Sequence, residues 1–194
     1  MNFDIIRQHA VAVKDVVNIQ INENQQVVKF SRVGRVKFKK AAPAIIIMAV
    51  AIASGLLHLT IGKIIVALVI VILVCWHLVD VLRDVTIDLN RKKLSIVLFN
   101  ITLNEFSMDE YRGALVYSLT LNGRQPTPKE FCVKFRHNGN RKEIHLADLL
   151  SETEDTSREN LQHVAEIWKF IVDCMQITDY DTEYQMSARN AIFA

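Results

Sequence analysis

The sequence has few of the residues and motifs from which most enzyme sites are built. It has six glycines among 194 residues, and it contains no G-x-x-x-x-G-K-[ST], G-x-G-x-x-G, G-x-S-x-G or H-E-x-x-H motif. None of the six histidines has a partner at metal-ligand spacing, and the acidic groups at 109–110 and 152–155 are typical of solvated loops or helix starts. We therefore predict that the protein is not an enzyme and has no catalytic, cofactor-binding or metal-binding residues.

Cysteine pairs and a leader segment are also lacking. Cys75, Cys132 and Cys174 lie far apart without a C-x-x-C motif, a pattern that predicts buried, reduced thiols in a reducing cytosol. The first forty residues contain no apolar run of the kind that a secretory signal peptide needs. The net charge of +2 is too small to indicate a nucleic-acid partner.

One long stretch has almost no charge. From Ala41 to Leu59 the chain reads AAPAIIIMAVAIASGLLHL, and after residues 60–63 it continues as IIVALVIVILVCWHLV. A spanning helix needs about 20 apolar residues, and this stretch is about twice that length. Neither half has the polar stripe of a helix in a soluble core. The sequence thus predicts a transmembrane helical hairpin over residues 41–82, with its tip near Thr60–Lys63.

The charges that flank this stretch predict its orientation. Cations gather on both sides of it, whereas the tip offers only Lys63. The positive-inside rule then places both termini in the cytoplasm, at the inner (cytoplasmic) membrane. The same cations are candidates for contact with anionic lipid head groups, although the topological role already explains them. The candidates are Lys29, Arg32, Arg35, Lys37, Lys39, Lys40, Arg91, Lys92 and Lys93.

Short segments on both sides of the apolar stretch have the alternation of β-strands. The expected strands are Val16–Ile21 and Gln26–Phe38 before it, and Val85–Leu89, Leu94–Leu98, Ala114–Leu121, Phe131–Arg136 and Lys142–Leu146 after it. Asn138-Gly139 between the last two is the strongest hairpin signal in the chain. The opening segment, residues 2–16, fits a short helix or a leading strand, and the sequence leaves both open.

The last expected element is a helix. Thr156-x-x-Glu159 matches a capping box, and apolar residues then recur at helical spacing from Leu161 to Met175. This helix can close one open end of a small β domain. The pattern ends near Asp179, so residues 179–194 are expected to be a loosely ordered tail.

The order of these elements resembles that of membrane-anchored bacterial pleckstrin-homology-like domain proteins. The layout is also similar to that of the photosystem I assembly factor family. The residues that carry the likeness are the turn 90–93 (NRKK), the hairpin Val133–Leu146 and the helix Leu161–Met175. The likeness is architectural, and no photosynthetic role is carried over.

These expectations combine into one architecture. We predict an α+β membrane protein in which a two-helix transmembrane hairpin is inserted in a small cytosolic β-barrel or β-sandwich closed by a C-terminal amphipathic helix. The expected parts are N-terminal cytosolic strands (1–40), the hairpin (41–82), the cytosolic β domain with its helix (83–178) and the tail (179–194).

Two classes of function fit this architecture. The first is a non-enzymatic inner-membrane protein whose β domain binds a protein partner, as an assembly or accessory factor of a membrane complex. The second is an effector, immunity or defence protein that senses a ligand and oligomerises through its hairpin. The expected partners are the lipid bilayer and either a protein partner or a second copy of the chain, and no nucleic acid or cofactor is expected.

Overall fold

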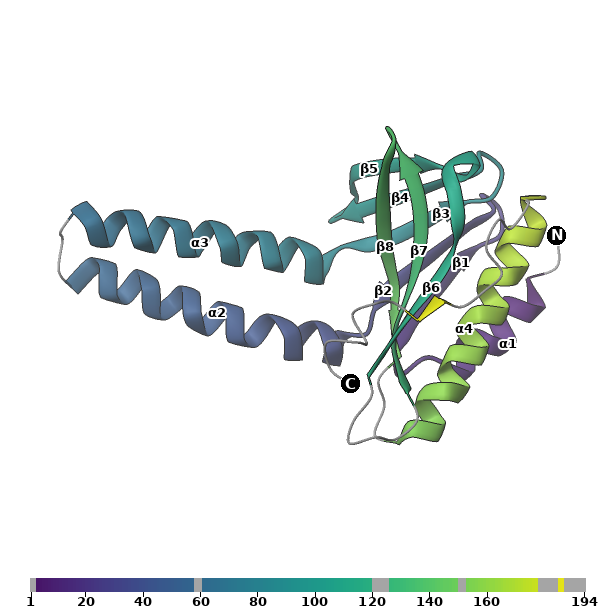
Figure 1. The fold of residues 1–194 in the computed structure, drawn as a ribbon, viewed down its shortest axis with the longest axis horizontal. Helices are drawn as coiled ribbons and strands as arrows, with labels where there is room; N and C mark the ends of the chain where they lie inside the picture. Colours follow the sequence, from purple (N-terminus) through teal and green to yellow (C-terminus); the bar gives the residue numbers. More distant parts are fainter. Residues whose placement is uncertain (1–2, 58–60, 120–125, 150–152, 178–184, 187–194) are drawn as a thin grey trace. The chain divides into compact units, whose positions relative to one another are not determined.

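The computed structural model describes residues 3–57, 61–119, 126–149, 153–177 and 185–186, and the chain forms two compact units. The first unit, Met1–Val33 with Asp84–Ala194, is called the two-sheet domain here. The second unit, Gly34–Arg83, is called the helical unit. The helical unit interrupts the two-sheet domain between its second and third strands (Figure 1).

Five antiparallel strands form sheet A in the order β1-β2-β3-β4-β5. They are β1 (Val17–Asn22), β2 (Val27–Arg32), β3 (Asp84–Asp88), β4 (Lys93–Leu98) and β5 (Ile101–Ser107). The strands on either side of the helical unit pair directly, with Val28 opposite Ile87 and Phe30 opposite Val85. The chain therefore leaves sheet A and returns to it at the same end of two adjacent strands.

Sheet B follows after a short 3-10 helix, η1 (Met108–Glu110). It consists of β6 (Tyr111–Leu119), β7 (Thr127–His137) and β8 (Asn140–Asp148), which are antiparallel, and the two-residue β9 (Gln185–Met186), which is parallel to β6. Asn138 and Gly139 between β7 and β8 have φ of 51° and 78°. Two positive φ values are the signature of a type I′ turn, so the predicted Asn-Gly hairpin is confirmed.

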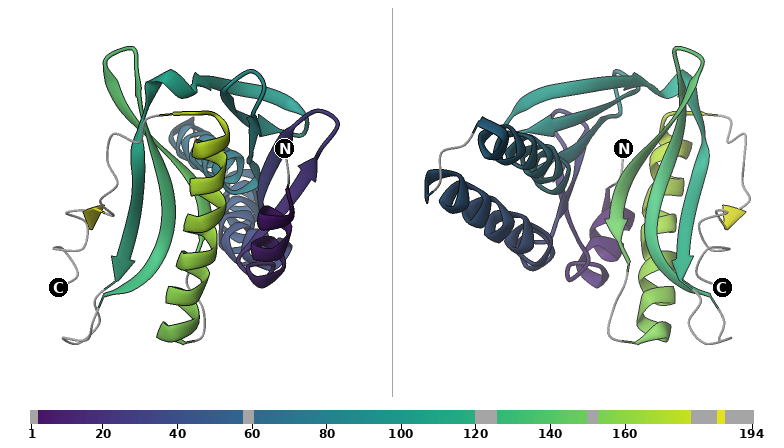
Figure 2. Two further views of the ribbon diagram at one scale, coloured as in Figure 1. Left: turned by 90° about the vertical axis from the view of Figure 1, so that its right-hand side faces the viewer. Right: turned by 60° about the vertical axis from the view of Figure 1, so that its left-hand side comes forward.

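Two helices complete the two-sheet domain, and they lie side by side in both views of Figure 2. These are α1 (Asp4–Ala12) and α4 (Glu154–Cys174), and α4 also packs against β7. One apolar core unites both sheets and both helices. At its centre, Trp168 Nε1 of α4 donates a 2.8 Å hydrogen bond to the Tyr111 hydroxyl oxygen of β6.

The predicted α+β class is confirmed, but the predicted β-barrel or β-sandwich closed by the C-terminal helix alone is wrong. The domain has two separate sheets, and no hydrogen-bonded ladder joins them among the residues that the structure describes. Sheet A ends at β5, a strand that the sequence did not predict because most of its residues are polar and exposed. The chain then turns through η1 into sheet B, and the helices rather than a strand ladder complete the core.

The prediction of two membrane-spanning helices is wrong as well. The helical unit contains α2 (Gly34–Leu57) and α3 (Ile61–Leu82), which pack against each other. Within the described part of the chain, only α3, over Ile64–Leu82, is long and apolar enough to cross a membrane. The expected second strand ends at Arg32, and α2 already begins at Gly34. Its first turns therefore include cations that the prediction placed outside the helix, namely Arg35, Lys37, Lys39 and Lys40.

The start of α4 also differs from the prediction. The N-cap is Thr153 rather than Thr156, and its hydroxyl oxygen accepts a 3.2 Å hydrogen bond from the Thr156 amide. Glu154 and Asp155 then occupy the first turn, where the helix dipole favours negative charge. The expected tail, residues 179–194, lies outside the described residues except for β9.

Candidate functional site

A β-bulge in sheet B gathers polar side chains on the face opposite the core. Glu130 of β7 pairs with Asp148 of β8, and Cys132 pairs with His145. The register shifts between Phe131 and Cys132, which leaves one extra residue in β8. In a regular strand, positions 145 and 148 would point to opposite faces. The bulge reverses this alternation, so His145 and Asp148 share a face with Glu130.

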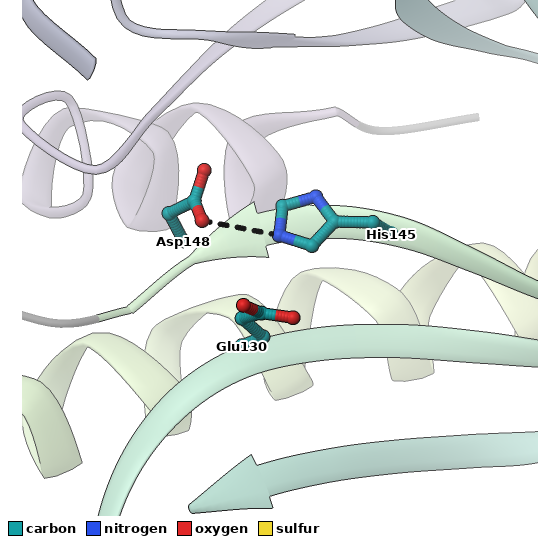
Figure 3. Close-up of side chains that lie close together, drawn as sticks. All are labelled: Glu130, His145 and Asp148. Carbon is teal, nitrogen blue, oxygen red and sulfur yellow. Dashed lines mark ion pairs between the residues drawn. The ribbon is translucent and has the colours of Figure 1, made fainter. Parts of the chain in front are cut away.

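These side chains form a cluster, called the polar cluster here, that consists of Glu130, His145, Asp148 and Arg32. Asp148 lies between two positively charged or protonatable partners. Arg32 Nε is 3.2 Å from Asp148 Oδ2, and His145 Nε2 is 3.3 Å from Asp148 Oδ1. Figure 3 shows the His145 ring and the Asp148 carboxylate pointing toward each other, with Glu130 on the neighbouring strand.

The polar cluster is largely shielded from water. The side chains of Arg32, Asp148 and His145 are 8%, 11% and 10% exposed, whereas that of Glu130 is 23% exposed. His145 Nε2 is buried and has no hydrogen-bond partner within the described residues. Because Arg32 is the last residue of β2, its ion pair with Asp148 links the edge of sheet B to sheet A.

Cys132 pairs with His145 and lies on the same face of sheet B as the polar cluster, where it is 4% exposed. Burial raises the pKa of its thiol from 9.0 to about 12, and the negative charges of Glu130, Glu143 and Asp148 add to this, against a smaller lowering by Arg32. The thiol is therefore protonated at neutral pH. The predicted burial is confirmed for Cys132, but it is wrong for Cys75, which is exposed, and Cys174 is only partly buried.

We expect Cys132 to make the protein less stable at alkaline pH. Because its pKa is higher in the folded chain, the unfolded chain loses this proton first as the pH rises above about 9. The free energy of unfolding should then fall by about 1.4 kcal/mol per pH unit relative to Cys132→Ala. Urea unfolding of both proteins between about pH 8 and about pH 10.5 measures this difference. Parallel pH dependences would contradict it.

The predicted lipid-binding cations occupy three different settings. Lys29 and Arg32 form ion pairs inside the two-sheet domain, with Asp84 at 2.9 Å and with Asp148. Arg35, Lys37, Lys39 and Lys40 belong to α2. Arg91, Lys92 and Lys93 lie in or next to the β3–β4 turn, at the end of β3 remote from Asp84. At about 3.3 Å per residue, that turn is about 15 Å from the point where the chain returns from the helical unit.

A second candidate surface is the exposed tip of the β4–β5 hairpin. We call it the β5 tip, and it consists of Phe99, Ile101 and Leu103. Their exposed fractions are 77%, 67% and 41%. Phe99 and Asn100 form the two-residue turn, with φ of 48° and 67°. A bulky residue in this left-handed region costs about 1–3 kcal/mol, a strain that occurs most often at functional positions.

The β5 tip lies at a defined end of sheet A. Val97 of β4 pairs with Asp84, the first residue of β3, and Phe99 of the tip follows two residues after Val97. Arg83, the last residue of the helical unit, immediately precedes Asp84. The tip is therefore at the end of sheet A where the chain connects to the helical unit.

Comparison with known proteins adds nothing to this geometry. No family model, no curated protein and no solved structure matches the chain. The resemblance to pleckstrin-homology-like membrane proteins therefore stays a prediction, and the two candidate surfaces rest on the structure alone.

Neither the polar cluster nor the β5 tip was predicted from the sequence. The residues of the polar cluster have no recognisable spacing, because the bulge and the pairing of distant strands bring them together. The β5 tip has a sequence signal in retrospect, since a turn-forming Asn100 stands between apolar residues in Leu98-Phe99-Asn100-Ile101.

Proposed function

We propose that the chain is a non-enzymatic, membrane-attached protein whose two-sheet domain binds a protein partner along β5. The exposed aromatic side chain of Phe99, on a backbone with positive φ, is the observation that carries the partner-binding part of this proposal. The apolar surface of the helical unit carries the membrane part.

The helical unit has a surface that suits lipid better than water. Only 11% of the Ile64–Leu82 stretch of α3 is buried within the chain, and Trp76 is 81% exposed. A soluble protein rarely leaves an apolar surface of this extent uncovered. Other large exposed side chains of the unit include Ile45, Ile46, Ile47, Val50, Ile65, Val66, Leu68, Val69, Ile72 and Leu73.

The strand pairing supports one orientation for the two-sheet domain. Because β2 and β3 pair, the segments before and after the helical unit belong to one folded domain. We infer that this domain lies on one side of the membrane, and that the helical unit enters the bilayer from that side without α3 carrying the chain across it. The cations at the start of α2 favour the cytoplasmic side, where positive charge near the membrane is retained. This proposal places both termini in the cytoplasm at the inner membrane.

The edge of β5 offers a partner both main-chain and side-chain contacts. Within the described residues, β5 pairs only with β4, so its other edge is open for the addition of a strand. An exposed edge strand with apolar side chains is otherwise an aggregation hazard that proteins avoid. Phe99 provides an aromatic anchor of the type that dominates binding energy at protein interfaces.

Attachment to a membrane favours a partner that is itself a membrane protein. The two-sheet domain is continuous in the chain with the helical unit, whose apolar surface suits lipid. We infer that the strand that pairs with β5 comes from a membrane-embedded or membrane-bound protein. An accessory or assembly factor of a membrane complex therefore fits the structure best.

Photo-crosslinking from β5 in intact cells tests this function. A photo-reactive residue replaces Thr102, which is exposed on β5, and a control replaces Val11 of α1, which is 69% exposed. We expect a discrete adduct with one membrane protein from position 102 and none from position 11. An adduct with lipid only, or with a second copy of this chain, would contradict partner binding.

The same experiment includes a variant that separates stability from binding. Asparagine adopts positive φ more readily than phenylalanine, so Phe99→Asn should stabilise the domain by about 1 kcal/mol. The loss of the aromatic anchor should lower the adduct yield at least about tenfold. Thermal melting and adduct quantification measure the two effects. An undiminished adduct in this variant would show that Phe99 does not bind the partner.

A further inference from the structure

We propose that Glu130, His145 and Asp148 bind a divalent transition-metal ion with the ligand preferences of zinc. One ligand atom from each of the three side chains lies within 4.8 Å of the others. Two carboxylates and one imidazole form a mixed oxygen and nitrogen set, which suits Zn²⁺ better than Ca²⁺ or Mg²⁺. The sequence predicted no metal site, because only the bulge in β8 brings His145 to this face.

The distance between His145 and Asp148 fits a shared ion. Two ligand atoms that are each about 2.1 Å from a tetrahedral ion lie about 3.4 Å apart. His145 Nε2 and Asp148 Oδ1 are 3.3 Å apart, and this contact does not have the geometry of a hydrogen bond. The two atoms are therefore already spaced as neighbouring ligands.

The buried nitrogen of His145 is an independent indication. Its side chain is 10% exposed, and Nε2 points at Asp148 without a hydrogen-bond partner within the described residues (Figure 3). Buried polar atoms almost always have a partner, and exceptions call for a specific explanation such as an ion. A metal ion between His145, Asp148 and Glu130 would satisfy this atom.

The surrounding charges permit a divalent cation. Arg32 contacts Oδ2 of Asp148, so Oδ1 faces the proposed ion while the guanidinium orients the carboxylate, as outer-shell partners of metal ligands commonly do. Lys129 Nζ lies 3.5 Å from Glu130 Oε1 at the more exposed side of the cluster. When the His145 imidazole is neutral, the two negative charges of Glu130 and Asp148 equal the two positive charges of Arg32 and Lys129. The net charge of these side chains is then zero, so the site does not repel a cation strongly. Glu130 is 23% exposed, so one ligand of the proposed ion is in contact with solvent.

The ion would strengthen the junction of the two sheets. Glu130 is on β7, His145 and Asp148 are on β8, and Arg32 reaches Asp148 from β2. The alternative explanation is a metal-free network in which a protonated His145 simply pairs with Asp148. The two explanations differ in whether added metal binds and whether it raises the melting temperature.

Metal titration of the full chain in mild detergent tests the site. After chelator treatment and dialysis, Zn²⁺ is added while heat release and thermal unfolding are measured, and Co²⁺ absorption reports the ligand set. We expect one ion per chain with a dissociation constant in the micromolar range or below. Saturating Zn²⁺ should raise the melting temperature by several degrees.

Ligand variants decide whether the ion is bound at the polar cluster. His145→Gln and Glu130→Gln should each weaken binding at least tenfold and abolish the Co²⁺ spectrum. His137→Gln should leave binding unchanged, because His137 contacts Glu110 in a different part of sheet B. Circular dichroism verifies that each variant is folded. Because Glu130 is the more exposed ligand, Glu130→Gln still tests the site if His145→Gln does not fold. No binding below about 1 mM, or binding that neither ligand variant weakens, would overturn the proposal.

Discussion

Removal of residues 1–33 is expected to leave residues 84–194 unable to fold. The deletion removes β1 and β2 from sheet A and α1 from its contact with α4. It also removes core side chains, including Val17, Val28 and Phe30, and Arg32, which is one of the two partners of Asp148 in the polar cluster. A loss of this size exceeds the 5–15 kcal/mol by which a typical domain is stable. Circular dichroism, amide exchange and limited proteolysis would show an unfolded chain.

A matched excision provides the control for this deletion. Replacement of Gly34–Arg83 by about four Gly and Ser residues should give a folded two-sheet domain, because β2 and β3 are adjacent antiparallel strands. A short linker suffices to join strands in this arrangement. If residues 84–194 folded without residues 1–33, the domain would not depend on strands from both sides of the helical unit.

Truncation of Trp168 is expected to have the largest effect of any single substitution in the core. Trp168 is 4% exposed, its ring lies 5.6 Å from that of Tyr111, and its Nε1 donates to the Tyr111 hydroxyl. Trp168→Ala should lower the free energy of unfolding by about 5 kcal/mol through the lost apolar contacts, the cavity and the lost hydrogen bond.

Trp168→Phe separates the contributions of the ring and of the N–H group. It keeps an aromatic ring in the core and removes the donor, so it should cost about 1–2 kcal/mol. Urea unfolding followed by far-ultraviolet circular dichroism measures both variants without the tryptophan signal. A cost below about 1 kcal/mol for Trp168→Ala would mean that α4 does not close the core as described.

Local patterns predicted the elements well where one physical signal was dominant. The alternation in β3 and β4, the Asn138-Gly139 turn and the apolar face of α4 each appear in the structure. For residues 2–16 the sequence did not decide between a helix and a strand, because the segment is short. In the structure it forms α1, and contact with α4 favours this helix.

The errors in the predicted elements have a common physical cause. Tertiary contacts determine whether these segments form strands or helices, and the local sequence pattern does not show those contacts. β5 is a strand although Thr102, Asn104 and Glu105 give it a polar pattern, since β4 supplies its hydrogen bonds. The start of α2 at Gly34 was missed because the basic residues after it alternate with apolar ones, as in a strand. The separation into two sheets depends on how the chain turns at η1, for which the sequence has no clear signal.

The polar cluster illustrates the limit of prediction from one sequence. Arg32 and Asp148 lie in strands from different parts of the chain, and the bulge that turns His145 toward them has no glycine to mark it. The structure was needed to show that these residues are neighbours.

Membrane sedimentation of the full chain and of the excised chain tests the central claim, that the helical unit holds the two-sheet domain on a membrane. Cell lysates are separated after an alkaline carbonate wash, which removes loosely bound proteins from membranes. We expect the full chain in the membrane pellet and the chain without Gly34–Arg83 in the soluble fraction, folded. A full chain that is released by carbonate, or an excised chain that stays in the pellet, would contradict the account.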